Sequence, residues 1–396
     1  MRGAGADGGV LNHLVAALAG APLPAALVDL DAFDRNAARL RGAKPLRVAT
    51  KSIRCPELIR RACAGGRLMT FTAAETAFWA DAGLADLVLA YPTAQASDAA
   101  LLAEANRRAR ARVVVDDAAQ LAPLADAAGR TGTTIPVVVD DDVDMSLRAL
   151  GLHLGVRRSP VHTAAAAVAL ARRAAATPGL AFDGVMGYEA QIAGLPDRSR
   201  ASRWMNAPAR AVKLASRPRV ERLRADVVAA LAAAGLPPEL LNGGGTGSAA
   251  WAAAEPALTE ITVGSGLLAG HLFDGYRDVD VEPALYFALP AVRRPAPGIV
   301  TCLGGGYVAS GAAGPDRLPM PVWPAGARLL PHEGAGEVQT PVALPAGVDV
   351  APGQPILFRP AKSGELAERF AEYLLVRGDR IEARAPTYRG LGRCFV

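Results

Sequence analysis

The chain has 396 residues, 51% of them apolar, and a formal net charge of +5 at pH 7. Its arginines occur singly or in pairs, with no long basic run and no interleaved aromatic residues, which argues against a nucleic-acid partner. No secretory signal is evident, and the alanine-rich stretches are interrupted by Arg, Asp or Pro before they could cross a bilayer. We therefore expect a cytoplasmic protein without a membrane partner.

Short apolar strands alternate with alanine-rich helices from about residue 23 to residue 275. This spacing predicts a parallel sheet, and about eight repeats favour a closed (β/α)8 TIM-type barrel over an open sheet. The predicted helices include residues 56–64, 73–82, 96–110, 118–128, 161–176 and 220–234. The predicted strands are residues 26–28, 46–49, 67–71, 87–90, 111–115, 135–139, 184–186, 240–242 and 260–263.

The pattern changes after about residue 275, where Pro becomes frequent and helices mostly vanish. Short strands at residues 298–303, 354–358 and 373–377 are separated by Gly and Pro. We expect three parts: an N-terminal extension (1–22), a barrel (23–275) and a C-terminal β-rich domain (276–396).

Lys51 follows the predicted strand 46–49, at the strand end where such barrels display their catalytic groups. The chain has only four lysines, Lys44, Lys51, Lys213 and Lys362, against thirty-nine arginines. Arginine cannot form a Schiff base, so a lysine at this place indicates that an amine is needed. The alternative is an ordinary charged residue at a strand end.

Two loops of small residues follow the last two predicted barrel strands. The first contains Gly243 to Ser248 and the second contains Val263 to Gly266. Adjacent glycines let backbone N–H groups approach an anion, and loops after the last strands of such barrels commonly hold a phosphate. Either loop alone could be merely flexible. Together with Lys51, the pair favours an aldehyde cofactor anchored by a phosphate, pyridoxal 5'-phosphate (PLP).

At these motifs the chain resembles the alanine racemase-like, fold type III PLP enzymes, in particular the D-threonine aldolase and D-serine dehydratase branch. The motifs are residues 27–31 (LVDLD), 49–52 (ATKS), 187–189 (GYE), 243–247 (GGGTG) and 264–265 (GS). The resemblance covers about residues 20–396. It implies that Lys51 forms the internal aldimine. It also implies that Tyr188 lies against the cofactor ring and that the phosphate is surrounded by Gly244, Gly245, Thr246, Gly264 and Ser265.

An arginine near the cofactor is also implied by the resemblance. Arg148 lies roughly at the corresponding position, although its local spacing differs, and Arg157 or Arg158 could fill the role instead. Alanine racemases place another arginine opposite the pyridine nitrogen. Here that position is Thr262, which argues against a plain alanine racemase.

The metal-dependent branch of the family carries a His-x-Cys or His-x-Asp pair in its C-terminal domain. The corresponding residues here are Ala361 and Ser363, neither of which is a credible zinc or manganese ligand. We therefore expect no metal. The acidic residues Asp140, Asp141, Asp142 and Asp144 resemble a metal cluster. We favour a solvated strand end with one helix cap, because consecutive residues of an extended chain point to opposite faces.

Without a metal, another group must deprotonate a substrate β-hydroxyl. Lys362 lies in the segment that replaces the metal pair, where a cation could substitute electrostatically. His332 lies near Glu333 and Glu337 in a glycine-bearing stretch that could reach the barrel mouth. Both are candidate catalytic residues, and for both the alternative is a solvated surface side chain.

We expect a PLP-dependent lyase that carries out aldol cleavage or transfer on a β-hydroxy-α-amino acid, D-configured or α-substituted. Alternatives are an amino-acid deaminase or dehydratase, a racemase or epimerase, and a non-catalytic PLP-binding protein. The resemblance and the strand-rich C-terminal region also predict a homodimer. The sequence does not specify the substrate's side chain.

Overall fold

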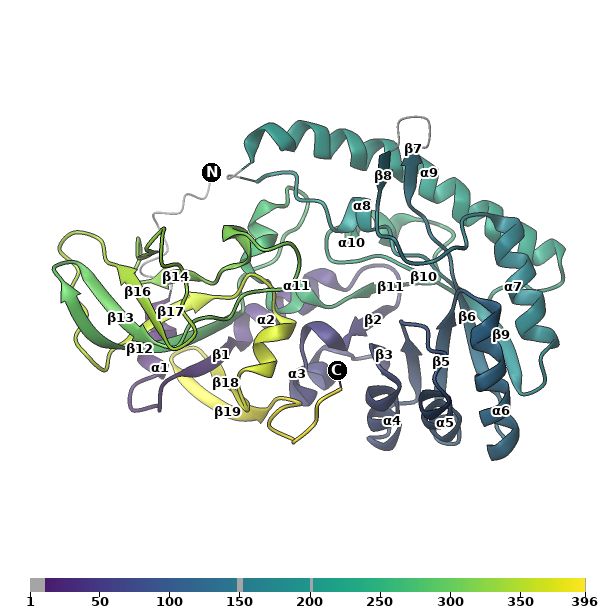
Figure 1. Ribbon diagram of the computed structural model, residues 1–396, viewed down its shortest axis with the longest axis horizontal. Coiled ribbons are helices and arrows are strands. Elements are labelled where there is room, and N and C mark those ends of the chain that lie inside the picture. Colours follow the sequence, from purple (N-terminus) through teal and green to yellow (C-terminus); the bar gives the residue numbers. More distant parts are fainter. Residues whose placement is uncertain (1–10, 148–151, 200–201, 396) are drawn as a thin grey trace.

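The computed structural model describes residues 11–147, 152–199 and 202–395. A barrel wrapped by helices lies beside a β domain, and the two pack along one side of the barrel (Figure 1). The short helix α1 (Asn12–Ala17) packs on the β domain through the buried side chains of Leu14 and of the preceding residue, Leu11. This architecture confirms the predicted fold class.

Eight parallel strands close the barrel, with each strand hydrogen-bonded to its two neighbours. Their interior side chains include a cluster of Val88, Val114, Val138, Met186 and Leu240. In barrel order the strands are β2 (Leu46–Ala49), β3 (Arg67–Thr70), β4 (Asp86–Leu89), β5 (Arg110–Val115), β6 (Ile135–Asp140), β9 (Leu180–Met186), β10 (Leu240–Gly243) and β11 (Glu260–Val263).

The predicted strand 26–28 forms, but its assignment to the barrel is wrong. This strand, β1 (Ala25–Asp29), pairs antiparallel with β12 (Leu285–Ala296) and parallel with β18 (Glu372–Arg377). It lies in the middle of the β domain's sheet, and all five of its residues are buried. The barrel strands therefore begin at Leu46. A strand buried on both faces has the same continuous apolar pattern in a barrel as in the middle of another sheet. The sequence pattern of β1 therefore could not show which strands it pairs with.

Helices cover the outside of the barrel. The side chains of Asp29, Thr72 and Thr163 each accept a hydrogen bond from a backbone N–H in the first turn of a helix. The helices are α2 (Leu30–Leu40), α3 (Pro56–Ala62), α4 (Ala73–Asp81), α5 (Ala96–Ala105), α6 (Leu121–Thr131), α7 (Ala164–Ala176), α8 (Ala190–Ala193), α9 (Asn206–Ala233), α10 (Ala249–Ala254) and α11 (Ser265–Leu268).

Helix α9 is longer than the predicted 220–234 and continues across Pro218. A proline inside a helix removes one hydrogen bond and is unfavourable. Here α9 packs against α7 and α8 and buries residues on both sides of the proline, including Ala209 and Val220. Tertiary packing therefore overrides the local signal that suggested a later start.

The end of the barrel opposite the strands' carboxyl ends is closed by buried charges. Arg47, whose side chain is fully buried, donates to both oxygens of Glu260, at 2.5 and 2.9 Å. It also donates to Asp86, which in turn accepts from Arg112. These pairs neutralise one another and plug the barrel, so a ligand can enter only from the other end.

The β domain has nine strands in one sheet and a small two-stranded hairpin lies elsewhere, beside the barrel. The predicted strands near 298–303, 354–358 and 373–377 are confirmed. Besides β1, β12 and β18, the sheet contains β13 (Ile299–Leu303), β14 (Met320–Trp323), β15 (Arg328–Leu329), β16 (Gln339–Ala343), β17 (Pro355–Arg359) and β19 (Arg380–Pro386), while the hairpin consists of β7 (Met145–Leu147) and β8 (Leu152–Leu154).

No helix in the described part of the chain is both long enough and apolar enough to cross a membrane.

Candidate active site

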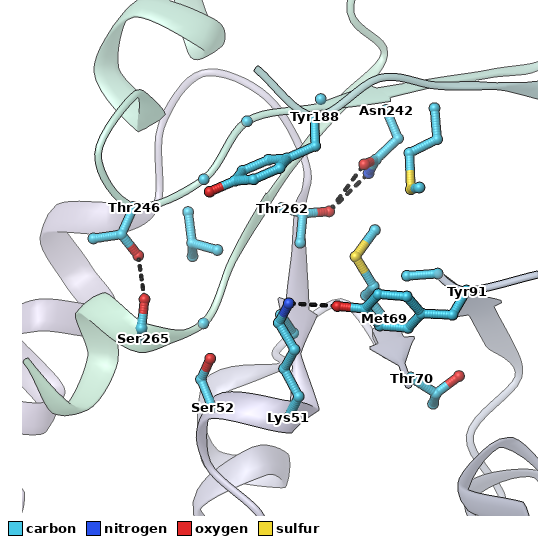
Figure 2. A pocket seen from close by; sticks show the side chains of 18 of the residues that line it. Lys51, Ser52, Met69, Thr70, Tyr91, Tyr188, Asn242, Thr246, Thr262 and Ser265 are labelled. Atoms are coloured by element: carbon cyan, nitrogen blue, oxygen red, sulfur yellow. Dashed lines mark hydrogen bonds between the residues drawn. The ribbon is translucent and has the colours of Figure 1, made fainter. Parts of the chain in front are cut away.

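Lys51 lies in a 3₁₀ turn, η1 (Thr50–Ser52), directly after β2. The turn is held from both sides. Thr50 Oγ1 donates to the carbonyl oxygen of Met69 on β3 at 3.0 Å, and Arg54 Nε donates to the carbonyl oxygen of Lys51 at 3.0 Å. Arg54 itself has a left-handed backbone, with φ of 51°. A fixed turn at the carboxyl end of a barrel strand aims the Lys51 side chain into the barrel mouth (Figure 2).

A pocket opens around the Lys51 side chain. It gathers every expected cofactor-contacting residue that lies in the described part of the chain, namely Lys51, Tyr188, Gly244, Gly245, Thr246, Thr262, Gly264 and Ser265. The predicted motifs also supply Ala49, Ser52, Gly243 and Val263. Residues that sequence analysis did not single out complete the wall: Met69, Thr70, Ala90, Tyr91, Met186 and Asn242.

Tyr91 contacts the amine of Lys51. Lys51 Nζ donates to the Tyr91 hydroxyl at 2.6 Å and lies 5.3 Å from the centroid of the ring (Figure 2). Sequence analysis missed Tyr91. The signal was present, because Tyr91 follows the predicted strand 87–90 just as Lys51 follows the strand 46–49.

An arginine also reaches the pocket. The Arg158 guanidinium carbon lies 6.0 Å from the Tyr91 ring centroid and 5.6 Å from that of Tyr188. Arg148, the first candidate for this place, lies outside the described residues. Of the two alternatives, Arg158 lines the pocket and adds a second positive charge to that of Lys51. Arg157 does not line the pocket. Burial raises the pKa of Tyr188 to about 12, so its hydroxyl stays protonated.

The two glycine-bearing loops meet across the pocket from Tyr91 (Figure 2). Thr246 Oγ1 lies 3.4 Å from Ser265 Oγ and accepts a hydrogen bond of 2.9 Å from Gly266 N. The N–H groups of Gly244 and Gly245, expected to face an anion, instead donate to Glu189 and Ser248. The hydroxyls of Thr246 and Ser265 are thus the side-chain donors that this wall offers.

A buried ion cluster holds the first loop from behind. Glu189 accepts from Gly244 N at 3.1 Å and from Ser248 Oγ at 2.6 Å. Arg224 donates to Glu189 at 2.6 Å and to Glu255 at 2.5 Å. Glu189 is fully buried, and its charge is balanced by the guanidinium group of Arg224. The loop's shape is therefore set by the protein before any ligand binds.

Thr262 belongs to a chain of hydrogen bonds that leads to the barrel plug. Asn242 Nδ2 donates to Thr262 Oγ1 at 2.8 Å and to Glu260 Oε1 at 2.7 Å. Glu260 is held in turn by Arg47. The hydroxyl of Thr262 therefore lies at a fixed place in the pocket wall (Figure 2).

The structure does not place the two expected acid–base residues in the wall of this pocket. Lys362 lies just outside it and donates to Ser310 Oγ at 3.1 Å. Partial burial lowers the pKa of Lys362, with further lowering from Arg317 and Lys51 against an opposing effect of Glu365. His332 is exposed in a turn of the β domain. Of the two, Lys362 is thus the residue close enough to Lys51 for their charges to interact.

The interpretation of Asp140 to Asp144 as a solvated strand end is wrong, because all four aspartates are buried. Both carboxylate oxygens of Asp141 lack a hydrogen-bond partner in the described part of the chain, and burial raises its pKa to about 7. Asp142 instead accepts from Asp144 N at 3.0 Å. One ligand atom each of Asp142, Asp144 and His162 lie within 4.8 Å of one another, a spacing compatible with a cation.

A (β/α)8 barrel with a lysine after its first strand, glycine-bearing loops after its last two strands and an attached β domain has the architecture of the alanine racemase-like proteins. The model of the family described as alanine racemase, N-terminal domain, matches residues 28–271, and the chain belongs to this family. The predicted family resemblance is confirmed.

Particular relatives are named as aldolases or as a dehydratase. The chain is 27% identical over 313 residues to a D-threonine aldolase from Arthrobacter sp, which is 76% of each protein. The structure of D-threonine aldolase from Filomicrobium marinum superposes with a TM-score of 0.79, at 25% identity, over 94% of this chain and 96% of that one. D-threo-3-hydroxyaspartate dehydratase from Delftia sp. HT23 has the same fold, with a TM-score of 0.74, 20% identity and coverage of 94% and 98%.

Proposed function

We propose that this protein is a PLP-dependent lyase that cleaves the Cα–Cβ bond of a β-hydroxy-α-amino acid, D-configured or α-substituted. The single observation that carries the proposal is the position of Lys51 Nζ in a pocket whose other wall presents the Thr246 and Ser265 hydroxyls. An amine and an anion site on opposite walls suit an aldehyde cofactor with a phosphate. The names of the two aldolase relatives support the choice of reaction.

The pocket's shape supports this cofactor. A Cβ added at Gly245 would lie 2.9 Å from Tyr188 Cε2, and one at Gly264 would lie 2.6 Å from the carbonyl oxygen of Ala49. Both positions therefore need glycine for the wall to keep its form. In this proposal Lys51 holds the aldehyde carbon, Thr246 and Ser265 hold the phosphate, and Tyr188 lies against the ring.

The bound cofactor supplies a conjugated ring that stabilises the electron pair left at Cα when a bond there breaks. The chain's own residues do the rest. Lys51 Nζ moves a proton to or from Cα, and Thr262 offers a neutral hydroxyl where alanine racemases have a guanidinium group. The Lys362 ammonium group supplies a positive charge beside the pocket, where the metal-dependent branch has its metal. His332 stays a prediction from the sequence.

Covalent attachment of the cofactor through Lys51 can be tested directly. PLP added to the protein should give an absorbance band that borohydride treatment bleaches, leaving the cofactor bonded to the peptide that contains Lys51. Lys51→Ala should give no such adduct, whereas Lys44→Ala should behave like the unmodified protein. An adduct in Lys51→Ala would remove the basis of the proposal.

Product analysis tests the reaction. β-Hydroxy-α-amino acids of both configurations are incubated with the PLP-loaded protein. An aldehyde plus a smaller amino acid supports the proposed lyase. A keto acid plus ammonia would indicate the dehydratase alternative, inverted stereochemistry a racemase or epimerase, and no product a PLP-binding protein without catalysis.

We also propose that the protein is a homodimer in which each β domain contributes to its neighbour's active-site mouth. Exposed apolar side chains support a contact surface, among them Val308 and Val338 in the β domain. Sedimentation should give a dimer, and a fully active monomer would contradict the proposal.

A further inference from the structure

Tyr91 is hydrogen-bonded to Lys51 in the pocket, and the proposed reaction as described above gives it no role. Its hydroxyl lies 2.6 Å from Lys51 Nζ and is directed into the pocket from the end of β4 (Figure 2). In aldol cleavage the β-hydroxyl must lose its proton as the Cα–Cβ bond breaks. The acceptor of that proton is the missing part of the site.

Few side chains of the described pocket wall can exchange a proton. Lys51 and Tyr91 can, whereas the guanidinium group of Arg158 has no acceptor capacity. Tyr188 is disfavoured as an acceptor, because burial raises its pKa to about 12. Lys362 does not line the pocket and points to Ser310. Tyr91 is thus the hydroxyl in direct contact with the group that would carry the cofactor.

Two cations flank the Tyr91 side chain. Lys51 Nζ contacts its oxygen, and the Arg158 guanidinium carbon lies 6.0 Å from its ring centroid. Positive charge near a phenol oxygen stabilises the negative charge that builds there during proton transfer. The surroundings of Tyr91 therefore favour a proton-exchanging role over a purely packing one.

Stereochemistry places a substrate hydroxyl within reach of Tyr91. A substrate amine that takes the place of Lys51 would lie near the region now occupied by Nζ. A β-hydroxyl is three bonds from this nitrogen, and a gauche arrangement about Cα–Cβ brings it to the same hydrogen-bond partners. Tyr91 OH, which now contacts Nζ, is such a partner.

We propose that Tyr91 accepts the proton of the substrate's β-hydroxyl and passes its own proton to the released amine of Lys51. This inference rests on the proposed lyase function. The hydroxyl O–H bond breaks, the C–O bond becomes a carbonyl, and the Cα–Cβ bond breaks with its electron pair left at Cα. Lys51 then delivers its extra proton to Cα. One proton has moved from oxygen to carbon, the products are an aldehyde and a smaller amino acid, and no other reactant is needed.

Tyr91→Phe in the PLP-loaded protein separates this role from others, because it keeps the ring and removes the hydroxyl. Aldehyde release from D-threonine should fall by about 10²–10⁴-fold, the usual contribution of a general acid–base group. Exchange of the glycine α-hydrogen in D₂O needs Lys51 but no β-hydroxyl, so its rate should fall far less than that of aldehyde release. Tyr91→His, which restores a proton-exchanging group, should recover part of the aldehyde release. Tyr307→Phe, which removes a hydroxyl in the β domain, is the matched control.

A second readout needs neither cofactor nor turnover. The chain has four lysines, so ¹³Cε-labelled lysine gives few signals, and Lys51→Ala identifies that of Lys51. Tyr91→Phe should move the Lys51 signal in the cofactor-free protein, because Nζ loses its hydrogen-bond partner, whereas Tyr307→Phe should leave it in place.

Three outcomes would overturn the proposal. Equal losses of aldehyde release and glycine exchange would mean that Tyr91 only positions Lys51. Undiminished aldehyde release in Tyr91→Phe would mean that its hydroxyl has no part. An unmoved Lys51 signal would mean that the contact is absent in solution. Failure of the proposed function looks different, because the unmodified protein would then exchange glycine yet release no aldehyde from any β-hydroxy-α-amino acid.

Discussion

The hydroxyl of Ser363 donates a 2.8 Å hydrogen bond to the carbonyl oxygen of Ser52, so a turn of the β domain is bonded to the turn that carries Lys51. The next residue, Gly364, packs on the same turn. The position of the lysine thus depends on two segments that are 311 residues apart in the chain.

Gly364→Ala should displace the Lys51 turn. A Cβ at this position would lie 2.1 Å from the carbonyl oxygen of Lys51, and backbone cannot yield as a flexible side chain can. We expect a loss of about 1–3 kcal/mol in the free energy of unfolding, with weaker PLP binding. Denaturant titration and fluorescence titration with PLP measure the two effects. Gly129→Ala, within α6 and with no atom near its Cβ, is the control and should be neutral or stabilising.

Thr246→Val and Gly245→Asp should both weaken PLP binding. The first removes a hydroxyl from the expected phosphate site, which should raise the dissociation constant by about tenfold, the equivalent of 1.4 kcal/mol. The second places a negative charge beside the phosphate and should have a larger effect. The control is Thr133→Val, just before β6 at the other end of the barrel, which should leave the dissociation constant for PLP unchanged. An unaltered dissociation constant for PLP in both pocket variants would mean that the phosphate binds at another place.

Turnover should survive exhaustive treatment with a chelator. Ala361 offers no ligand atom, and the hydroxyl of Ser363 is engaged with Ser52, so neither residue at the place of the usual metal pair is suited to zinc or manganese. Activity before and after chelation is compared at equal PLP loading. Loss of activity that Mn²⁺ or Zn²⁺ restores would contradict the prediction. His162→Ala would then show whether the group with Asp142 and Asp144 holds the ion.

Lys362→Met should reduce kcat/KM by roughly tenfold, which corresponds to the loss of about 1.4 kcal/mol of electrostatic stabilisation. The pKa of Lys362 is lowered, so its charge is present at low pH and is lost as pH rises through that lowered value. Activity that depends on the charge should therefore decline at alkaline pH. Lys362→Arg keeps the charge throughout and should remove this decline. A pH–rate profile that is the same in all three proteins would exclude a role for the ammonium group.

Glu75 should make the protein less stable as pH rises. Burial raises its pKa to about 7 although Tyr388 OH donates to it at 2.6 Å. A carboxyl whose pKa is raised by folding stabilises fully below its unfolded pKa, and that stability is lost as pH rises through the folded value. Between its ordinary pKa and about pH 7 we expect a loss of at most about 1.4 kcal/mol per pH unit from this residue. Urea titrations should give a flatter pH dependence for Glu75→Gln, although Asp140 and Asp141 act in the same direction. If the slope of the free energy of unfolding against pH is unchanged in Glu75→Gln, the loss of stability comes from those aspartates instead.

Local sequence signals were enough to predict the repeated strands and helices, because the periodicity of apolar residues and the glycine-bearing turns are properties of short segments. They also singled out Lys51 and the loops that end in Thr246 and Ser265. In a barrel, residues that follow parallel strands gather at one end whatever the details of packing. That rule sufficed to place these side chains in one pocket.

Relations between distant segments were decided only by the tertiary structure. β1 has the pattern of a barrel strand but pairs with β12 and β18, because a buried strand does not encode its partners. Asp141 is buried, contrary to the expectation of a solvated strand end. Tyr91 contacts Lys51, 40 residues away, because β2 and β4 flank β3 in the barrel and both residues follow the carboxyl ends of their strands. The sequence alone therefore determined which lysine lies at the end of a barrel strand beside the glycine-bearing loops, because these are properties of short segments, whereas the packing of distant segments decided which side chains surround it.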